Sequence, residues 1–386
     1  MAPPRVVWTD GTPASVERLR RAVLDALGGG PAVLPLDPRN PGSEELLAAM
    51  APDEPVEEGT AVLMPTSGST GSPKGVLLSA RALLTSANAT HERLGGPGRW
   101  LLATPAHYIG GLQVLVRSHL AGAPPLVLDT SGGFSPEAFE VAAGQLLQTQ
   151  GPHYTALVPT QLTRLLDAGG AGLAGFGSVV VGGAALPDEL RRRATAAGVN
   201  VVSAYGMSET ASGCVYDGVA LRGVRVQIGE GERIEISGDV LADGYRLRPD
   251  ETAAAFVDGW FHTGDVGRID GAGRLEVLGR ADDLINTGGV KVAPQVVEQA
   301  LTAHPSVASA CVVALPDAKW GQVVAAAVVP SGAPPPAAQL REAARAELGG
   351  PGVPKVLRFV SELPLLGPGK VDRAAVRALL RGSSGH

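Results

Sequence analysis

Short apolar runs alternate with amphipathic stretches through residues 1–220, and this alternation constrains the fold more than any other feature of the chain. The runs are rich in β-branched residues and bounded by Gly and Pro, as buried strands are. The stretches between them place apolar residues at the spacing of one helix face. Such alternation favours α/β layers with largely parallel strands. We expect strands at 31–36, 60–65, 99–105, 124–129, 154–159, 177–183 and 199–206, and helices at 15–27, 135–148, 159–168 and 187–198.

The rest of the chain has two further patterns. Between residues 223 and 279 the apolar runs shorten and are separated by tight turns such as Asp-Gly, which is typical of antiparallel hairpins. A new strand-and-helix pattern follows, and its start near 280–283 predicts a domain boundary there. We therefore expect an N-terminal domain, 1–280, of layered α/β subdomains with a small β-rich section, and a small α+β C-terminal domain, 281–386. In the latter we expect strands at 307–317 and 321–330 and helices at 294–304, 337–348 and 372–382.

Composition excludes several classes of function. The chain has 386 residues, of which 45% are hydrophobic and 18% charged, so it can bury a sizeable core. A net charge of −6 without a basic cluster argues against non-specific binding to nucleic acid or anionic membranes. No membrane span or apolar signal segment is expected, which makes the cytoplasm the default compartment. Cys214 and Cys311 are interpreted as buried small hydrophobes. The sequence leaves open whether the chain forms a homo-oligomer.

A segment rich in glycine and hydroxyl groups, residues 65–75, lies between two apolar runs. It fails the Walker pattern, because Pro73 stands where that pattern needs glycine and Gly75, not Ser or Thr, follows Lys74. Its hydroxyls, its glycine N–H groups and the Lys74 ammonium nevertheless suit an anion. A flexible linker is the alternative, although linkers rarely separate two apolar runs.

A second constellation, residues 203–210, follows the apolar run Asn-Val-Val at 200–202. Glu209 stands between two hydroxyl residues at a strand end, where it suits Mg²⁺ with nucleotide phosphates completing the metal shell. Tyr205 can stack on a purine ring. Taken alone, such residues are also ordinary material for turns and helix starts. Three later blocks, at 260–265, 279–283 and 367–372, give the constellation its weight.

In order and spacing, the blocks between residues 61 and 380 resemble the acyl-adenylate-forming enzymes, the AMP-binding superfamily of acyl-CoA synthetases, luciferases and peptide-synthetase adenylation domains. Ser69 and Ser208 stand where threonine is frequent in that family, and both keep the hydroxyl. The resemblance implies an acyl-CoA synthetase-like fold with a mobile C-terminal domain. It also implies two steps: an acid reacts with ATP and Mg²⁺ to give an acyl-adenylate and pyrophosphate, and CoA then takes the acyl group.

The resemblance further implies an ATP site made from separate blocks. The cover over the β- and γ-phosphates would be residues 66–74, including Thr66, Ser67, Gly68, Ser69, Thr70 and Lys74. The adenine side would be formed by Gly182, Gly183, Ala184, Tyr205 and Gly206, and the ribose hydroxyls would be held by Asp265 and Arg280. The catalytic residues would be Glu209 as the Mg²⁺ ligand, Thr210 at the α-phosphate, and Lys370 between the α-phosphate and the acid carboxylate.

The resemblance also predicts how the second step is served. Asp282 stands at the hinge of the family. Gly288 and Gly289 would leave room for the pantetheine arm of CoA, although an ordinary hairpin turn explains this glycine pair as well. Lys291 is either solvated or a contact for a CoA phosphate.

The acyl pocket is expected along residues 104–118, where His107 and Gly110 match the start of a helix at the acyl site of the family. On that helix Gly111, Leu115 and Ser118 share one face, and Arg117 lies beside that face. An arginine in an apolar pocket needs an anionic partner, which suggests an acid with a second carboxylate. Helical geometry alone leaves open that Arg117 points to solvent.

Residues 90–122, together with the short chain before the glycine-rich loop, resemble the short o-succinylbenzoate:CoA ligases of menaquinone biosynthesis, whose aromatic acid has two carboxylates. This resemblance implies conversion of o-succinylbenzoate and CoA to o-succinylbenzoyl-CoA, with release of AMP and pyrophosphate. The alternatives are an acyl- or aryl-CoA ligase for another acid and a stand-alone adenylation domain that charges a carrier protein. A nucleotide-binding module without catalysis fits less well, because binding alone needs neither Glu209 nor Lys370.

Overall fold

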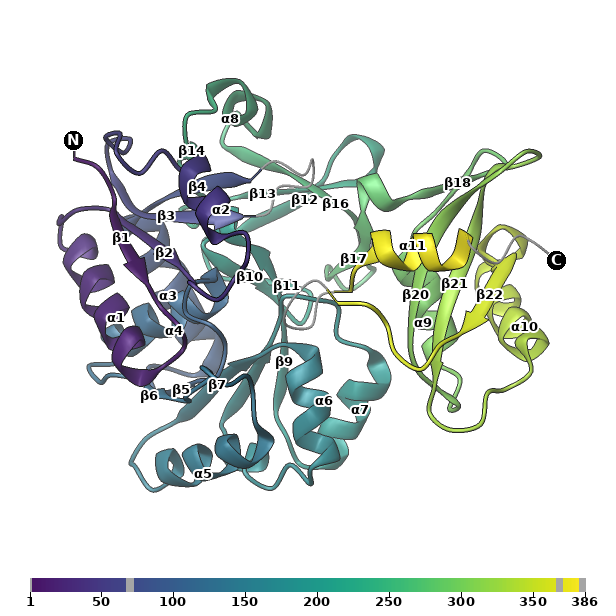
Figure 1. The fold of residues 1–386 in the computed structure, drawn as a ribbon, viewed down its shortest axis with the longest axis horizontal. Coiled ribbons are helices and arrows are strands. Elements are labelled where there is room, and N and C mark those ends of the chain that lie inside the picture. Colours follow the sequence, from purple (N-terminus) through teal and green to yellow (C-terminus); the bar gives the residue numbers. More distant parts are fainter. Residues whose placement is uncertain (1, 67–72, 366–370, 382–386) are drawn as a thin grey trace. The chain divides into compact units, whose positions relative to one another are not determined.

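The computed structural model describes residues 2–66, 73–365 and 371–381 (Figure 1). The chain divides into two compact units, which are described separately. The first unit comprises Met1–Leu186, Arg193–Gln227 and Glu235–His262, and the second comprises Pro187–Arg192, Ile228–Ile234 and Thr263–His386. The domain boundary expected after residue 280 stays a prediction. Within the described ranges, none of the helices has the length and apolarity needed to cross a membrane.

The first unit contains two sheets that follow the predicted strand-and-helix alternation. One has the order β1-β2-β3-β4-β14, with β1 to β3 parallel and the remaining pairs antiparallel. Its strands are β1 (Arg5–Trp8), β2 (Val33–Leu36), β3 (Thr60–Thr66), β4 (Lys74–Ser79) and β14 (Gly244–Tyr245).

The other sheet has the order β11-β10-β9-β8-β7-β5-β6 and is parallel except at β10 and β11, so largely parallel strands are confirmed. Its strands are β5 (Arg99–Leu102), β6 (Leu126–Val127), β7 (His153–Leu157), β8 (Ser178–Val181), β9 (Val201–Met207), β10 (Ser212–Tyr216) and β11 (Val219–Ala220).

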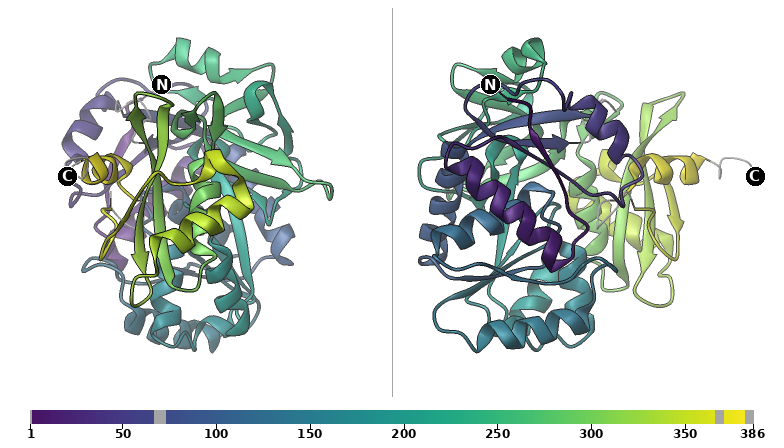
Figure 2. Two further views of the ribbon diagram at one scale, coloured as in Figure 1. Left: turned by 90° about the vertical axis from the view of Figure 1, so that its right-hand side faces the viewer. Right: turned by 60° about the vertical axis from the view of Figure 1, so that its left-hand side comes forward.

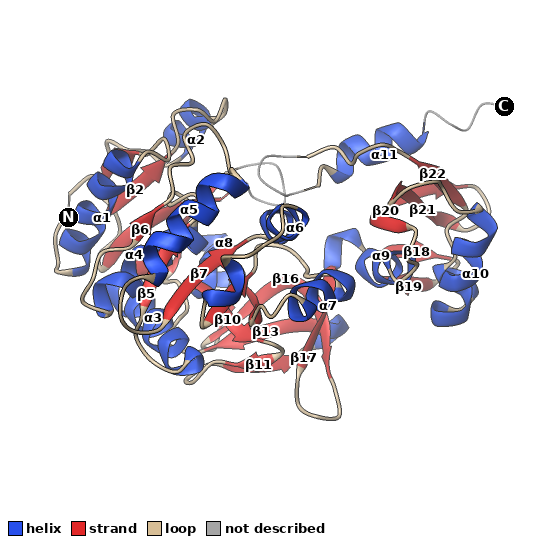
Figure 3. Cartoon of the chain, turned by 90° about the horizontal axis from the view of Figure 1, so that it is seen from below, coloured by secondary structure: helices blue, strands red, loops and turns tan. Residues whose placement is uncertain are grey.

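Three helices separate these sheets: α1 (Pro13–Leu27), α3 (Ala80–Leu94) and α4 (Ile109–Leu120). Helix α1 contacts β1 to β3, α3 contacts β3, β4 and β10, and α4 contacts β5, β7 and β10. Helix α5 (Pro136–Leu147) packs against β5 and β6 on the other side of the seven-stranded sheet (Figures 1 and 3). The remaining helices up to residue 255 are α2 (Ser43–Ala49), α6 (Pro159–Asp167), α7 (Asp188–Ala196) and α8 (Pro249–Ala255).

The antiparallel hairpins predicted for residues 223–279 are confirmed. Strand β16 (Trp260–Ile269) pairs antiparallel with β15 (Phe256–Val257) and with β17 (Leu275–Arg280). Strands β12 (Arg225–Ile228) and β13 (Arg233–Ser237) belong to the same sheet.

The C-terminal part of the second unit is a single sheet with helices packed on both faces (Figure 2). Its sheet has the order β19-β18-β21-β20, with β22 parallel to β21. Strand β20 alternates from Ala310 to Leu315: Cys311, Val313 and Leu315 pack against α11, whereas Val312 packs with Val297 of α9. This period of two lets one strand serve two cores. The elements are β18 (Ile285–Thr287), β19 (Val290–Val292), α9 (Pro294–Thr302), β20 (Val307–Asp317), β21 (Gly321–Pro330), α10 (Ala337–Leu348), β22 (Val356–Phe359) and α11 (Arg373–Arg381).

Both cysteines are free and buried, as expected. Burial raises the pKa of each thiol to about 12, so both stay protonated at neutral pH.

Candidate active site

The stem of the glycine-rich loop is the antiparallel pair β3 and β4. Thr66 lies opposite Lys74 in register, and its hydroxyl donates to the Lys74 carbonyl at 3.3 Å. The stem therefore brings the first and last residues of the predicted phosphate cover together. Ser67, Gly68, Ser69 and Thr70 lie outside the described residues.

Lys74 makes two contacts with residues near α8. Its Nζ lies 2.5 Å from Glu251 Oε2 and 4.9 Å from the centre of the Tyr245 ring. Glu251 also pairs with Arg248 at 2.5 Å, and Arg248 donates to the Pro73 carbonyl at 3.0 Å. The end of the loop is thus tied to the first turn of α8.

Glu209 and Thr210 belong to a single 3₁₀ turn, Ser208–Thr210, directly after β9. The Tyr245 hydroxyl donates to Glu209 Oε1 at 2.9 Å, which orients the carboxylate. The Thr210 side chain is fully buried, and its hydroxyl accepts from the Met207 N–H at 2.9 Å and donates to the Ser212 carbonyl at 2.7 Å. Thr210 therefore holds the turn that presents Glu209, and its contact with the α-phosphate stays a prediction.

The residues predicted for the adenine side lie at the carboxyl ends of β8 and β9. These strands are parallel, with Val181 opposite Ser203, so residues 182–184 follow β8 beside Tyr205. Gly206 allows β10 to come close, because a Cβ there would lie 2.1 Å from the Ser212 carbonyl oxygen. This edge is where open parallel sheets bind ligands. The fold thus brings Gly182, Gly183, Ala184, Tyr205 and Gly206 to one edge.

Asp265 and Arg280, the predicted ribose pair, lie in the second unit. They face each other across β16 and β17, and Arg280 Nη1 is 3.4 Å from Asp265 Oδ1. Arg280 Nη2 is 3.9 Å from Asp282 Oδ2, so the predicted hinge residue shares this cation. Lys370 lies outside the described residues.

Gly288 and Gly289 form the turn of the β18–β19 hairpin, with φ angles of +60° and +85°. A Cβ at Gly288 would lie 2.6 Å from the Trp320 ring, so glycine lets the indole lie against the turn. Trp320 is 41% exposed, and the ammonium groups of Lys319 and Lys355 lie 5.1 and 6.0 Å from its ring centre. Lys291 is exposed on β19.

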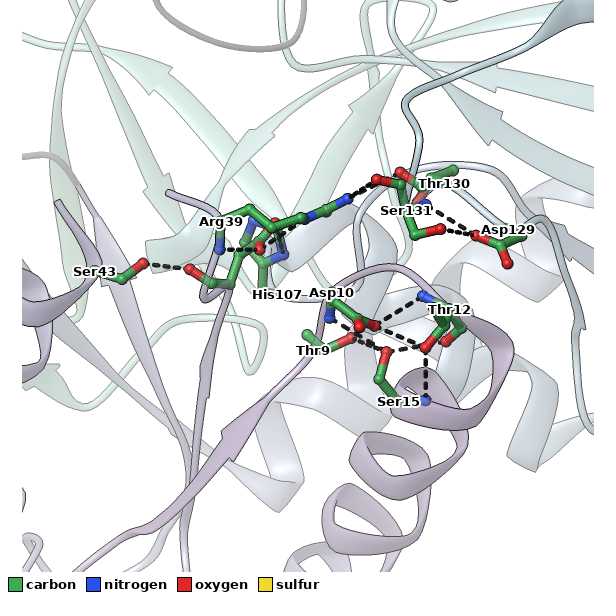
Figure 4. A network of polar contacts seen from close by, with 11 residues as sticks. Thr9, Asp10, Thr12, Ser15, Arg39, Ser43, His107, Asp129, Thr130 and Ser131 are labelled. Carbon is green, nitrogen blue, oxygen red and sulfur yellow. Dashed lines mark hydrogen bonds and ion pairs between the residues drawn. The ribbon is translucent and has the colours of Figure 1, made fainter. Parts of the chain in front are cut away.

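His107 lies just before α4, and Gly110 lies in the first turn of that helix. His107 Nδ1 is 3.9 Å from Asp37 Oδ2, which pairs with Arg39 at 2.7 Å. Arg39 also donates to the Ser131 carbonyl at 2.8 Å (Figure 4). Burial lowers the pKa of His107 to about 4, so its imidazole is uncharged at neutral pH.

Arg117 is buried inside the first unit, with 1% of its surface exposed. Its guanidinium lies 5.2 Å from the Trp100 ring centre, and Nη2 is 3.5 Å from the Tyr216 hydroxyl. None of the described residues forms an ion pair with it, and neither its Nε nor the Ser118 hydroxyl has a hydrogen-bond partner among them. The solvent-facing orientation is therefore excluded. Burial lowers the pKa of Arg117, but a guanidinium stays protonated in proteins.

The described residues contain no group of three or more His, Cys, Asp or Glu that could hold a metal ion. A magnesium ion needs fewer protein ligands, because substrate phosphates and water complete its shell. The oriented carboxylate of Glu209 fits that requirement.

Sequence reasoning missed Tyr245, Glu251 and Asp37. Each touches a predicted site residue across a long stretch of chain. The local signals were the Gly-Tyr pair at 244–245, the Pro-Asp-Glu helix start at 249–251 and the Asp-Pro-Arg that follows the strand predicted at 31–36. None of these patterns indicates which site residue the side chain contacts.

Two family models match the chain. The AMP-binding enzyme family matches residues 9–236, and the C-terminal domain of AMP-binding enzymes matches residues 296–370. The first match alone covers more than half of the chain.

Related proteins agree with this match. A protein of Mycobacterium tuberculosis named "probable 2-succinylbenzoate–CoA ligase" is 46% identical over 363 residues, covering 92% of this chain and 93% of that protein. A sulfoacetate–CoA ligase of Cupriavidus necator is 35% identical, covering 95% of this chain and 76% of that protein.

Solved structures of the o-succinylbenzoate CoA synthetase of Bacillus subtilis have the same fold. The complex with its acyl-adenylate intermediate superimposes with a TM-score of 0.74 at 27% identity, covering 96% of this chain and 78% of that one. The complex with ATP and a magnesium ion gives a TM-score of 0.72 at 26% identity, with coverages of 94% and 82%. The predicted acyl-CoA synthetase-like fold is thereby confirmed, and the chain belongs to the AMP-binding enzyme family.

Proposed function

We propose that this protein is an ATP-dependent acid–CoA ligase that converts o-succinylbenzoate and CoA to o-succinylbenzoyl-CoA, AMP and pyrophosphate through an acyl-adenylate. The observation that carries the choice of acid is the buried guanidinium of Arg117, which has no anionic partner among the described residues. An acid with two carboxylates supplies that partner with one and reacts with the other. The relative named 2-succinylbenzoate–CoA ligase supports the same choice.

In the first step the acid carboxylate attacks the α-phosphorus of ATP and pyrophosphate leaves. Negative charge builds up where the two anions meet, so fixed positive charge is the main requirement of the site. Lys74 at the loop stem would contact the β- and γ-phosphates, and Lys370 would lie between the α-phosphate and the carboxylate. Because the two lysines come from different parts of the chain, Lys74 would act on the leaving pyrophosphate and Lys370 on the reacting centre.

Glu209 would hold Mg²⁺, with Tyr245 fixing one oxygen of its carboxylate. When bound, the ion supplies positive charge beside the phosphate oxygens. The neutral His107 would add no charge to the apolar side of the site, so the ring of an aromatic acid can lie near it. Asp265 and Arg280 would contact the ribose hydroxyls.

In the second step the CoA thiol attacks the carbonyl of the acyl-adenylate and AMP leaves. Lys370 must withdraw before the thiol enters, which is why a movable C-terminal domain with a hinge at Asp282 suits the reaction. Trp320 beside the Gly288–Gly289 turn offers a flat surface with two lysines for a purine and its phosphates. ATP and CoA as substrates make the cytoplasm the proposed compartment.

Replacing Trp320 with alanine is expected to raise the KM for CoA by about fivefold or more, because stacking on a base contributes roughly 1–3 kcal/mol. ATP–pyrophosphate exchange should not change, since the first step needs no CoA. Trp320→Phe keeps a flat ring and should restore most of the affinity. A parallel loss of exchange in Trp320→Ala would contradict this role.

ATP–pyrophosphate exchange over a panel of acids tests the proposed substrate. We expect exchange with o-succinylbenzoate and a loss of roughly 10²-fold or more in kcat/KM with acids that lack one of its carboxylates, because Arg117 would stay unpaired. Strong exchange with benzoate or acetate and none with o-succinylbenzoate would point instead to another acyl- or aryl-CoA ligase.

Product analysis with CoA as the only thiol separates the remaining alternatives. Formation of o-succinylbenzoyl-CoA is the expected result. Adenylate formation without free acyl-CoA would indicate a stand-alone adenylation domain for a carrier protein, and ATP binding without any exchange would indicate a nucleotide-binding module.

A further inference from the structure

The ammonium of Lys74 is enclosed on two sides. Glu251 Oε2 lies 2.5 Å from Nζ on one side, and the Tyr245 ring lies 4.9 Å away on another. Only 18% of the Lys74 side chain is exposed, against 38% for Glu251. An ion pair with one partly buried member is screened less than a pair on the open surface. The carboxylate of Glu251 therefore decides where this lysine points.

Glu251 binds a second cation as well. Its Oε1 lies 2.5 Å from Arg248 Nη1, while Arg248 Nη2 donates to the Pro73 carbonyl at 3.0 Å. Hydrogen bonds from Lys74 and Arg248 lower the pKa of Glu251, so the carboxylate is ionised at neutral pH. Arg248 can hold the stem at Pro73 without Lys74, which leaves the lysine as the exchangeable partner.

We propose that Glu251 is a positioning residue that holds Lys74 while the site is free of phosphates, and that the phosphates of ATP take the lysine from it. The inference rests on the role of Lys74 in the proposed function. The Lys74 ammonium has one positive charge, and the Glu251 carboxylate neutralises it while the two are paired. The ion pair with Glu251 therefore competes with contacts between Lys74 and the phosphates. The phosphates of ATP carry more negative charge than one carboxylate and therefore displace Glu251 from Lys74. Breaking the ion pair lowers the affinity for ATP below the value expected without Glu251. When pyrophosphate departs, Glu251 recovers the lysine and eases product release.

The substitution Glu251→Gln tests this competition, because it removes the charge and keeps the shape and a hydrogen-bond acceptor for Arg248. The KM for ATP and the inhibition constant of pyrophosphate should both fall by about twofold to fivefold, the range typical of partly exposed ion pairs. Both constants can be measured by ATP–pyrophosphate exchange. Asp250→Asn is the matched control: it removes a neighbouring charge that is exposed and has no ion pair within the described residues, so both constants should stay at their original values.

A double-mutant cycle with Lys74→Met separates competition from simple support of the stem. Without the ammonium there is nothing to compete for, so adding Glu251→Gln to Lys74→Met should leave the KM for ATP unchanged. The inference is overturned if Glu251→Gln raises the KM, or if it changes the KM equally in both backgrounds. If Lys74→Met alone leaves the KM for ATP unaltered, both the inference and the assignment of Lys74 to the phosphates fall. The choice of acid is judged separately, by the acid panel.

Discussion

Replacing Lys370 with alanine is expected to slow adenylate formation by about 10²–10³-fold, as removal of other preorganised charge contacts does. The ammonium would stabilise negative charge that develops only as the carboxylate meets the α-phosphorus, so the loss should fall on kcat more than on the KM for ATP. ATP–pyrophosphate exchange with o-succinylbenzoate measures this step directly.

The second step provides the internal control for Lys370. Synthetic acyl-adenylate mixed with CoA in a single turnover should react with the alanine variant at close to the original rate, because the lysine has left before the thiol attacks. Lys370→Arg keeps the charge in a different shape and should recover part of the exchange rate. Equal losses in both half-reactions would mean that Lys370 supports the fold instead of the first step.

Three elements of the C-terminal part were predicted from the sequence to the residue. The expected ranges 307–317, 321–330 and 337–348 are the observed bounds of β20, β21 and α10. Each side of β20 packs into a different core, so nearly every position carries an apolar residue and the ends are marked by polar turns. Local sequence and tertiary packing agree here, which is why the prediction is accurate.

Helix α3 and strand β4 were not predicted, and their composition explains why. The buried face of α3 includes Ala82, Ser86 and Thr90, which are small or polar and give little apolar periodicity. The Ser86 hydroxyl is satisfied by the Ala211 carbonyl at 2.9 Å, a partner supplied by a distant part of the chain. Strand β4 begins at Lys74, inside the segment interpreted as a loop.

The motifs predicted which residues form the site but not which of their side chains contact one another. Asp265 and Arg280 could be paired by resemblance, and the register of β16 and β17 provides the physical reason. The contacts of Tyr245 with Glu209 and of Glu251 with Lys74 depend on how β14 and α8 reach β4, which no local pattern encodes. Pairs of this kind need the tertiary structure.

The orientation of Arg117 was undecidable from helical geometry for a specific reason. Every residue from Gly111 to Ser118 of α4 is buried, so within this stretch the helix has no polar face to which a charged side chain could turn. Trp100, Tyr216 and the α3 helix occupy its surroundings in place of solvent. Arg117 is buried although none of the described carboxylates neutralises its charge. A buried charge without a partner breaks the usual rule for protein interiors, and such exceptions are expected at functional sites.

Replacing Arg117 with methionine is expected to lower kcat/KM for o-succinylbenzoate by about 10²-fold or more, because breaking a buried charge pair costs roughly 3–5 kcal/mol. Methionine fills a similar volume and removes an unpaired buried charge, so the Tm of the unliganded protein should stay the same or rise. Scanning calorimetry with and without o-succinylbenzoate should show a ligand-induced rise in Tm for the original protein only. Arg164→Met is the matched control, since Arg164 also stacks on an aromatic ring, 5.5 Å from the Phe134 centre, but is exposed on α6.

The result of this substitution separates binding from support of the fold. A loss confined to o-succinylbenzoate, with ATP affinity and Tm preserved, places Arg117 at the second carboxylate. A drop in Tm with equal loss of activity toward acids with one and two carboxylates would make Arg117 a packing residue beside Trp100, and the choice of a dicarboxylic acid would lose its physical basis. Arg117→Lys discriminates further, because a lysine keeps the charge but cannot form the planar two-point contact with a carboxylate, so it should recover only part of the lost kcat/KM.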